Sequence, residues 1–181
     1  MPRFTIPTRD TAPTASQPIL DAIDKQFGVV PNLFRLVAQS PAALAGLTGL
    51  SGALAKALDV KTRARIAIAT AQANGCDYCL SAHSYLGVNL AKISPEEIAL
   101  NRKGGSSDAK ADAAVRFATK VATTRGKVSE ADLSAVRNAG FSDAQIIEIV
   151  AVVAENFLTN FINNVAETDI DFPVVRAIQA A

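Results

Sequence analysis

The sequence predicts an all-α protein, a bundle of about eight helices in a single domain covering residues 1–181. Apolar residues recur at intervals of three and four rather than two, alanine is abundant, and helix start and stop signals divide the chain. The only strand-like alternation is the short segment 3–8. With 181 residues, 49% of them hydrophobic, the chain is long enough for one domain with a hydrophobic core, and a second domain is not expected.

Capping residues and prolines indicate four helices in the first half of the chain. Ser40 precedes a proline that can occupy the first helical position, and Asp59 can cap the helix that follows. The helix after Asp59 ends before Gly75, because glycine tolerates the left-handed conformation typical of helix ends. The four helices are expected over residues 16–28, 31–37, 40–57 and 59–73.

Serine residues mark helix starts in the second half of the chain. Three of them are followed, three residues later, by a side chain that can return the capping hydrogen bond, a pattern typical of helix N-termini. The pairs are Ser94 with Glu97, Ser129 with Asp132 and Ser142 with Gln145. The Gly-Gly-Ser-Ser segment at 104–107 is expected to be a flexible connection.

Charge and hydropathy exclude several classes of partner. Eighteen basic and seventeen acidic residues leave a formal net charge of +1, and no basic run predicts binding to nucleic acid or to a membrane surface. The N-terminus has an early charge but no apolar stretch behind it, so we expect no signal peptide and a cytoplasmic protein. The apolar segment 146–161 contains Glu148, Glu155 and Asn156 and falls short of the ~20 apolar residues that span a bilayer. It is expected to be a buried helix.

Two further patterns have structural interpretations. Gly46, Gly49 and Gly52 share one face of the helix 40–57, which predicts a close approach to another helix rather than a phosphate site. Glu148 and Glu155 could form an acid–base pair, but a solvated edge or an interface stripe is the favoured interpretation. The apolar excess of their helix indicates a contact between subunits.

The sequence also contains one weak internal similarity. Shifting the segment 62–86 by 81 positions places it over 143–167, with Asn160 beneath Cys79 and Asn164 beneath His83. A duplicated helical hairpin would give this pattern, and so would any two amphipathic helices.

Both cysteines and the only histidine of the chain lie in one short stretch. Cys76, Cys79 and His83 occupy positions i, i+3 and i+7, which places them on one face of a helix that begins after Gly75. The free N–H groups of a first helical turn favour a thiolate, so the pKa of each thiol should lie below the ~8.5 of a free cysteine.

This grouping indicates redox chemistry. A peroxide would oxidise the attacking thiolate to a sulfenic acid, and the second cysteine would then form a disulfide with it. His83, four residues after Cys79, could take up or return a proton near that sulfur. A separate reductant must then restore the dithiol.

Three other interpretations of these residues stay open. A zinc site is disfavoured because the chain has no further cysteine or histidine to complete four ligands. A structural disulfide is disfavoured by the expected cytoplasmic location and by the short loop it would close. The third interpretation is two inert buried thiols beside a core histidine.

The segment 73–83, together with the alanine-rich helix before it, resembles the alkylhydroperoxidase D-like proteins of the carboxymuconolactone decarboxylase family. The segments 4–7, 30–34, 40–44 and 160–173 resemble its peroxidase-related branch, so the resemblance covers nearly the whole chain. It implies an all-helical homo-oligomer, often a trimer or hexamer. It also implies a cysteine-based peroxidase or disulfide reductase that uses a hydroperoxide and an external dithiol or protein reductant, without metal, haem or flavin.

The resemblance also assigns roles to the catalytic residues and points to one departure. Cys79 would be the attacking thiolate and Cys76 the resolving thiol, with His83 in the proton relay. Members with the full relay have a glutamate twelve residues before the first cysteine, where this chain has Ala64. Asp77 or Tyr78 could replace this carboxylate, although both are also common surface and packing residues.

Two functions from different classes remain. The first is a thiol-dependent peroxidase or disulfide reductase in oxidative defence. The second is a non-catalytic or redox-sensing helical oligomer, which Ala64 keeps open because the relay carboxylate is missing. Decarboxylation of a lactone acid is disfavoured because family members with that activity generally lack the cysteine pair.

Overall fold

The computed structural model describes residues 3–178 and confirms the all-α class. Within this range the chain forms nine α-helices and one short 3-10 turn, η1 (Thr14–Ser16), and no strand. The domain prediction for 1–181 therefore extends slightly beyond the described residues at both ends. The helices are α1 (Gln17–Phe27), α2 (Asn32–Val37), α3 (Pro41–Leu54), α4 (Val60–Ala73), α5 (Asp77–Asn89), α6 (Pro95–Arg102), α7 (Ala109–Thr124), α8 (Glu130–Asn138) and α9 (Asp143–Ala166).

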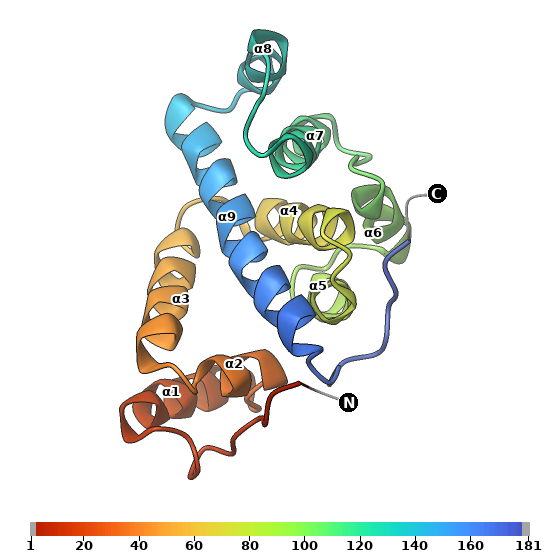
Figure 1. Cartoon of the computed structure of the whole chain (residues 1–181). Coiled ribbons are helices and arrows are strands. Elements are labelled where there is room, and N and C mark those ends of the chain that lie inside the picture. Colours follow the sequence, from red (N-terminus) through yellow and green to blue (C-terminus); the bar gives the residue numbers. More distant parts are fainter. Residues whose placement is uncertain (1–2, 179–181) are drawn as a thin grey trace.

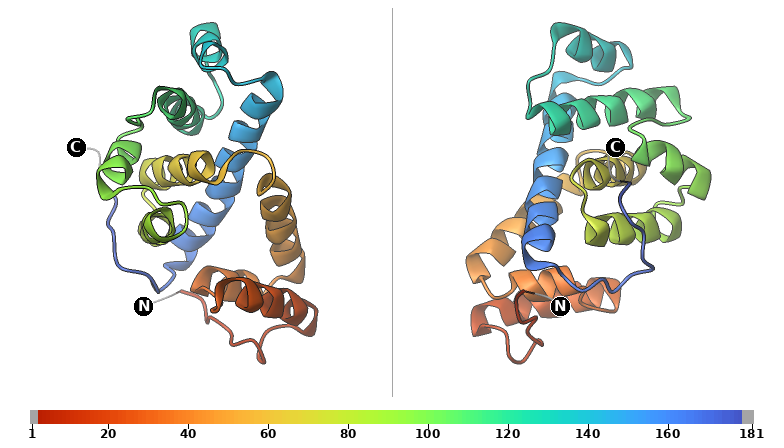
Figure 2. Two further views of the ribbon diagram at one scale, coloured as in Figure 1. Left: turned by 180° about the vertical axis from the view of Figure 1, so that it is seen from behind. Right: turned by 45° about the vertical axis from the view of Figure 1, so that its right-hand side comes forward.

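Helices α4 and α9 organise the packing of the other elements (Figure 1). Helix α4 contacts α5, α6, α7 and α9, and most of its residues from Ile66 to Ala71 are buried. Helix α9 crosses the molecule, with α3 along one flank, α4–α7 along the other, and α1 and α2 near its C-terminal end, and the two further views show the same arrangement (Figure 2). Helices from both halves of the chain therefore meet along α9.

The capping residues explain most helix boundaries. The reciprocal pairs Ser129–Asp132 and Ser142–Gln145 both form as predicted, and the Asp59 side chain accepts hydrogen bonds from two backbone amides of α4. The pair Ser94–Glu97 forms only in part: Ser94 caps α6, but Glu97 does not bond back to it. Ser16 lies at the predicted start of α1, yet its hydroxyl donates to the Ala38 carbonyl (2.7 Å).

The predicted flexible connection at 104–107 is held in place. Ser107 donates to Glu97 through its backbone N–H (3.0 Å) and its hydroxyl (2.6 Å), and the Ser106 hydroxyl donates to the same carboxylate. Asp108 then caps α7, the helix for which the sequence analysis identified no start signal, by accepting from Ala111 N–H (2.8 Å). The prediction of flexibility was wrong because a buried carboxylate binds the loop.

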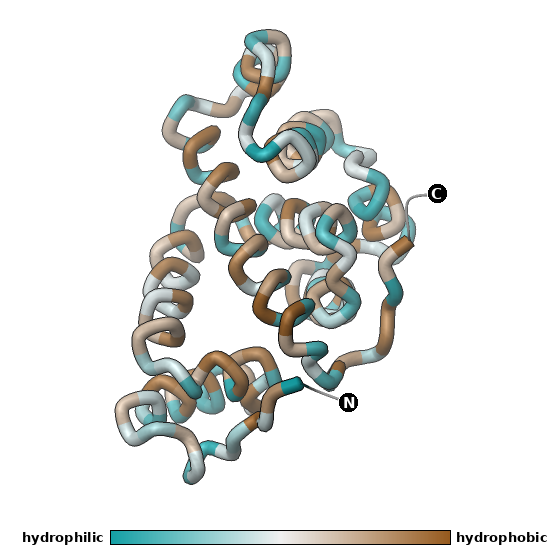
Figure 3. The backbone as a smooth tube through the Cα atoms, viewed as in Figure 1, coloured by the Kyte–Doolittle hydropathy of each residue, from teal (hydrophilic) through white to brown (hydrophobic). Residues whose placement is uncertain are grey.

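Helix α9 corrects two predictions. It is one continuous helix of 24 residues, whereas the segment 62–86 forms two helices joined by a turn, so a duplicated hairpin is excluded. It is also buried on one face only: Ile149 and Val152 lie in the core, whereas Ile147 is 69% and Phe161 52% exposed. Its apolar residues are visible along the helix in Figure 3.

Among the described residues, α9 is also the one helix long and apolar enough to cross a membrane by length and composition alone. Its contacts with α3, α4, α5 and α7 are those of a central helix in a packed bundle. This observation is weak evidence for membrane insertion, because core helices pass the same test.

The glycine face of α3 does not make the predicted close contact. A Cβ added at Gly46, Gly49 or Gly52 would meet nothing within 4 Å, and all three residues are exposed. The prediction of a close helix–helix approach is therefore wrong for the single chain.

The turn between α4 and α5 determines where the cysteines lie. Gly75 adopts a left-handed conformation (φ +61°) and donates to the Gln72 carbonyl (3.2 Å), while Cys76 N–H donates to the Ala71 carbonyl (3.0 Å). These two bonds form a Schellman motif, which satisfies the last carbonyls of α4. The motif places Cys76 at the N-cap of α5.

The Glu97 network gives a prediction for stability against pH. Burial alone would raise the pKa of Glu97, but hydrogen bonds from Ser106, Ser107 and Asn101 lower it to about 2. Arg65 Nε lies 3.2 Å from its Oε1. A carboxylate with a lowered folded-state pKa contributes stability above its unfolded pKa of about 4.5, and this is lost as pH falls toward 2.

We therefore expect E97Q to lower the free energy of unfolding at pH 7 by roughly 3 kcal/mol, because Arg65 loses its buried partner. Urea unfolding at several pH values should show the difference from wild type shrinking between pH 5 and 2. The exposed neighbour variant E96Q is the control. An equal effect of E96Q and E97Q would contradict this account.

Candidate functional site

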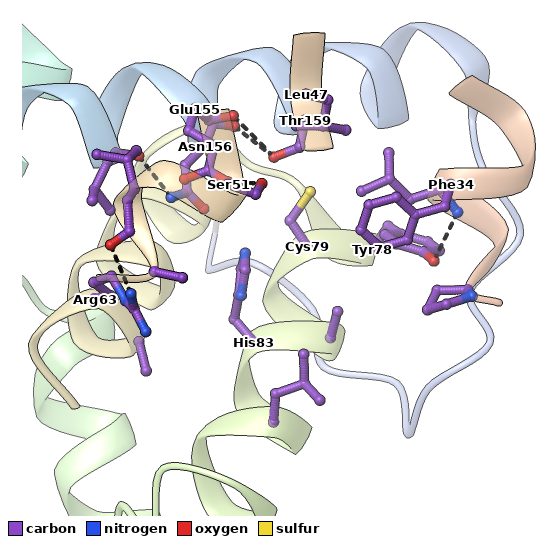
Figure 4. A pocket seen from close by; sticks show the side chains of 18 of the residues that line it. Phe34, Leu47, Ser51, Arg63, Tyr78, Cys79, His83, Glu155, Asn156 and Thr159 are labelled. Atoms are coloured by element: carbon purple, nitrogen blue, oxygen red, sulfur yellow. Dashed lines mark hydrogen bonds between the residues drawn. The ribbon is translucent and has the colours of Figure 1, made fainter. Parts of the chain in front are cut away.

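A cavity of about 360 Å³ lies between helices from both halves of the chain (Figure 4). Most of its wall is apolar and includes Phe34, Leu47 and Phe172. Its polar side chains are Ser51, Arg63, Tyr78, Cys79, His83, Glu155, Asn156 and Thr159. The cavity therefore combines a mainly apolar wall with a small group of side chains capable of acid–base and thiol chemistry.

Cys79 presents its sulfur to this cavity from the first turn of α5. Asn163 Nδ2, on α9, donates a hydrogen bond to Cys79 Sγ at 3.2 Å. Burial would raise the pKa of Cys79, but hydrogen bonding from the Cys76 side chain and from Asn163, together with the nearby Asn160 amide, outweighs burial and lowers it below the ordinary value. The thiol that faces the cavity is thus the one stabilised as an anion.

Cys76 lies behind Cys79 and is not part of the cavity wall. Its Sγ accepts the backbone N–H of Cys79 at 3.2 Å, so the sulfur caps the first turn of α5. Hydrogen bonding to Cys79 and burial both raise the pKa of Cys76, so this thiol keeps its proton. The expectation that both thiols have lowered pKa values was therefore wrong for Cys76. Both cysteines are free thiols.

His83 follows Cys79 by one helical turn and also lines the cavity (Figure 4). Its ring is half-buried, and loss of solvation lowers its pKa to about 4, although the nearby Asn156 side chain opposes this decrease. The imidazole is therefore neutral at pH 7. A neutral ring can accept a proton on one nitrogen and donate one from the other, so it suits proton transfer better than proton storage.

Glu155 is the carboxylate of the cavity wall, and the structure corrects its interpretation as part of a solvated edge. It is half-buried on α9 and accepts a hydrogen bond from the Ser51 hydroxyl of α3. Burial raises the pKa of Glu155, although the Ser51 hydrogen bond and the nearby Arg63 guanidinium oppose the increase. Ala64 lines the cavity as well.

Asp77 and Tyr78 make tertiary contacts instead of replacing a relay carboxylate. Asp77 accepts from Ala177 N–H (2.8 Å) and from Arg176 Nη1 (2.7 Å), which holds the C-terminal segment against α5. The Tyr78 hydroxyl accepts from Leu33 N–H (3.0 Å), and burial raises the pKa of the phenol. The packing interpretation of both residues agrees with these contacts.

No group of three or more histidine, cysteine or acidic side chains within residues 3–178 could hold a metal ion. The cavity wall contains one buried thiol, Cys79, with a neutral imidazole and a carboxylate, and the second thiol, Cys76, lies behind it. Fold and site together define a class of protein: an all-helical bundle with a Cys-x-x-Cys pair at a helix start.

Comparisons with known proteins show a partial family match and a shared fold. The sequence model of the carboxymuconolactone decarboxylase family matches residues 41–124. A peroxidase-related protein from Ralstonia eutropha JMP134 with an alkylhydroperoxidase AhpD core has a TM-score of 0.84 at 26% identity, over 94% of this chain and 92% of that one. The chain therefore has the AhpD-like fold, and its segment 41–124 is similar to the carboxymuconolactone decarboxylase family.

Two more distant structures share the fold. A peroxidase-related protein from Silicibacter sp. TM1040 has a TM-score of 0.80 at 24% identity, over 93% of this chain and 91% of that one. A variant of the debrominase Bmp8 in complex with 2,3,4-tribromopyrrole has a TM-score of 0.79 at 20% identity, over 94% of each chain. No curated protein is similar enough in sequence to count as a match.

Two asparagines that face Cys79 were not among the site residues predicted from the sequence. Asn163 is 3% exposed and Asn160 is fully buried, and Asn160 Nδ2 has no hydrogen-bond partner within the described chain. The side-chain oxygen Oδ1 of Asn160 accepts a hydrogen bond from Asn74 Nδ2 (2.8 Å). This bond holds the Asn160 amide beside the turn that precedes α5. Two asparagines three residues apart in an apolar helix are the signal that could have identified them.

Replacing Asn163 should therefore change the acidity of Cys79. We expect N163A to raise the pKa of Cys79 by about one to two units, because a hydrogen bond to a charged group is worth roughly 1.5–3 kcal/mol. The pH dependence of alkylation by iodoacetamide measures this pKa. The control is N164A, since Asn164 is exposed and donates to a backbone carbonyl instead. An unchanged midpoint in N163A would rule out this role.

Proposed function

We propose that this protein is a thiol-dependent peroxidase that reduces organic hydroperoxides with Cys79 and Cys76 and is reset by an external dithiol or protein reductant. The observation that supports this most directly is the pairing of a cavity-facing thiol of lowered pKa with a protonated thiol behind it. The family and the peroxidase-related neighbour support the same class of reaction. A cytoplasmic location fits a dithiol that must be reduced after each turnover.

The proposed reaction has two chemical steps. The Cys79 thiol first loses its proton, and the thiolate attacks the terminal oxygen of the hydroperoxide, so that an S–O bond forms and the O–O bond breaks. The alkoxide leaves and takes up, through His83, the proton that Cys79 released, which gives the alcohol and the Cys79 sulfenic acid. The Cys76 thiol then attacks the sulfur of the Cys79 sulfenic acid. The S–S bond forms, and hydroxide leaves with the Cys76 proton as water.

The cavity favours an apolar substrate over hydrogen peroxide. Phe34, Leu47 and Phe172 would contact the organic part of a hydroperoxide, whereas hydrogen peroxide would leave this apolar wall without a partner. Phe27 and Val60, also in the wall, are 43% and 52% exposed and mark the side from which a substrate can enter.

Substitution of each cysteine separates the two steps. With cumene hydroperoxide and excess dithiothreitol, wild type should complete many turnovers and C79S none. C76S should form a sulfenic acid on Cys79 that dimedone traps, because the resolving thiol is missing. S84A, a conservative change on the same helix outside the cavity wall, should behave like wild type. Loss of dimedone labelling in C76S with retention in C79S would reverse the assignment of the cysteines.

The same assay discriminates the alternative of a redox sensor. Ala64 favours that alternative, because a protein without the usual relay carboxylate could oxidise once and stop. One equivalent of peroxide consumed per chain, with no further turnover under excess dithiol, would identify a sensing module instead of an enzyme.

A second candidate activity is thiol-dependent dehalogenation. The fold shared with a debrominase that binds tribromopyrrole and the apolar wall of the cavity favour it. A dithiol can supply the two electrons, since an aryl bromide and two thiols give the arene, hydrogen bromide and a disulfide. Bromide release from 2,3,4-tribromopyrrole, without peroxide consumption, would favour this activity.

We also propose that the protein is a homo-oligomer, a trimer or a hexamer, as the resemblance to the family implies. Helix α9 has an exposed apolar stripe along its whole length, formed by Ile147, Val150, Leu158, Phe161 and Val165. An exposed stripe of this length is typical of an interface between subunits. The exposed glycine face of α3 offers a second surface on which another helix could approach closely.

Replacing one residue of the stripe tests the oligomer. Light scattering coupled to gel filtration should give wild type a mass of three or six times 18.9 kDa, and L158E a monomer, because a buried glutamate would have no partner in an apolar interface. K120E, an exposed change on α7, is the control. A monomeric wild type at micromolar concentration would refute the proposal.

A further inference from the structure

Glu155 lies where a proton acceptor and donor would be useful to the proposed peroxidase. Its carboxylate, from α9, and the imidazole of His83, from α5, both line the cavity that Cys79 faces (Figure 4). The wall also contains Ala64, which has no group able to hold a proton. The other charged side chain of the wall, Arg63, stays protonated and donates to the Leu54 carbonyl (2.7 Å).

The site needs such a group because His83 cannot store a proton. Its pKa of about 4 leaves the ring neutral at pH 7, so a proton that leaves Cys79 must pass beyond the ring. Within the described cavity wall, Glu155 is the carboxylate available to receive it. Its raised pKa brings protonation closer to neutral pH.

We propose that Glu155 stores the proton of this site, exchanging it with Cys79 through His83 and returning it to the alkoxide that leaves when a hydroperoxide is cleaved. This inference rests on the proposed peroxidase function. Ser51 is a positioning residue, because its hydroxyl donates to Glu155 Oε1 and holds the carboxylate in the wall. Glu155 would therefore supply from α9 the carboxylate that Ala64 lacks on α4.

The proton balance closes over one oxidation. The Cys79 thiol gives its proton through His83 to the Glu155 carboxylate, which leaves a thiolate and a carboxylic acid. The thiolate attacks the peroxide, and the acid returns the same proton through His83 to the alkoxide. The products are the alcohol and the Cys79 sulfenic acid, with Glu155 again ionised, and no further reductant or oxidant is needed for this step.

The variant E155Q separates proton transfer from thiolate formation. Turnover of cumene hydroperoxide at pH 7 should fall at least tenfold, since one positioned acid–base group is worth roughly 10²–10⁴ in rate. Alkylation of Cys79 by iodoacetamide, which needs only the thiolate, should not fall, and its midpoint should move to lower pH because a negative charge near the sulfur is removed.

The pH dependence of Cys79 alkylation can be assigned because few other charged or titratable side chains share the cavity wall with Glu155. The charged or titratable side chains of the same wall are Arg63 from α4 and Tyr78, Cys79 and His83 from α5. The one polar side chain that α3 adds to the wall is the hydroxyl of Ser51, and the side chains that α1 and α2 add are all apolar. Arg63 keeps its charge throughout, and burial keeps Tyr78 protonated, so the pH dependence reports on Cys79, His83 and Glu155.

Two more variants complete the experiment. E148Q removes the same charge from the same helix outside the cavity wall and should leave turnover and midpoint unchanged. E155D keeps a carboxylate and should retain more turnover than E155Q. Equal rates for E155D and E155Q, or a parallel fall of turnover and alkylation in E155Q, would overturn the proposal in favour of a structural role.

The result also distinguishes failure of this inference from failure of the proposed function. If wild type consumes no hydroperoxide, the peroxidase proposal fails. In that case a lowered alkylation midpoint in E155Q still supports proton exchange between Glu155 and Cys79, and an unchanged midpoint refutes it.

Discussion

The hydrogen bond from Asn163 Nδ2 to Cys79 Sγ is the interaction on which the proposed chemistry of this protein depends. Cys79 is only 2% exposed, and a thiol buried to this degree would ordinarily stay protonated and unreactive. The Cys76 thiol and the amide side chains of α9 together reverse this effect, because they stabilise the anion without bringing a charge into the core. The packing of α9 against α5 is thus as important for reactivity as the position of the cysteines at a helix start.

Neutral donors suit a sulfur whose charge changes during the reaction. A buried lysine or arginine beside Cys79 would stabilise the thiolate but would lose its partner when the sulfur becomes part of a disulfide, at a cost of several kcal/mol. An asparagine left without that partner costs less. The unpaired Asn160 Nδ2 and Asn163 Oδ1 atoms show that the described site tolerates such incomplete pairing. This tolerance is typical of sites in which stability is exchanged for function.

The sequence could predict the helices and turns, which depend on neighbouring residues. It could not predict the contacts between residues that are far apart in the chain. The helices followed from periodicity and caps, and the Schellman turn at Gly75 followed from glycine before a helix start. The role of Glu97 did not, because its partners Ser106 and Ser107 lie in a loop that has no signal of its own. The same limit applied to the site, since Cys79 and His83 are one turn apart whereas Asn163 reaches Cys79 from 84 residues away. Glu155 was assigned to an edge because the sequence does not show that α3 closes over it.

The boundaries of the family match divide the candidate site into two parts. The match covers residues 41–124, which contain both cysteines, His83 and α3 to α7, but neither α2 nor α9. Phe34 on α2 and Glu155 on α9 line the cavity, and Asn163 on α9 bonds the reactive sulfur. The matched region therefore provides the dithiol and the imidazole, whereas the wall that a substrate meets and the donors that adjust the thiol come in part from outside it. Members of the family can share the thiol chemistry and still differ in substrate, because these flanking helices form the rest of the cavity.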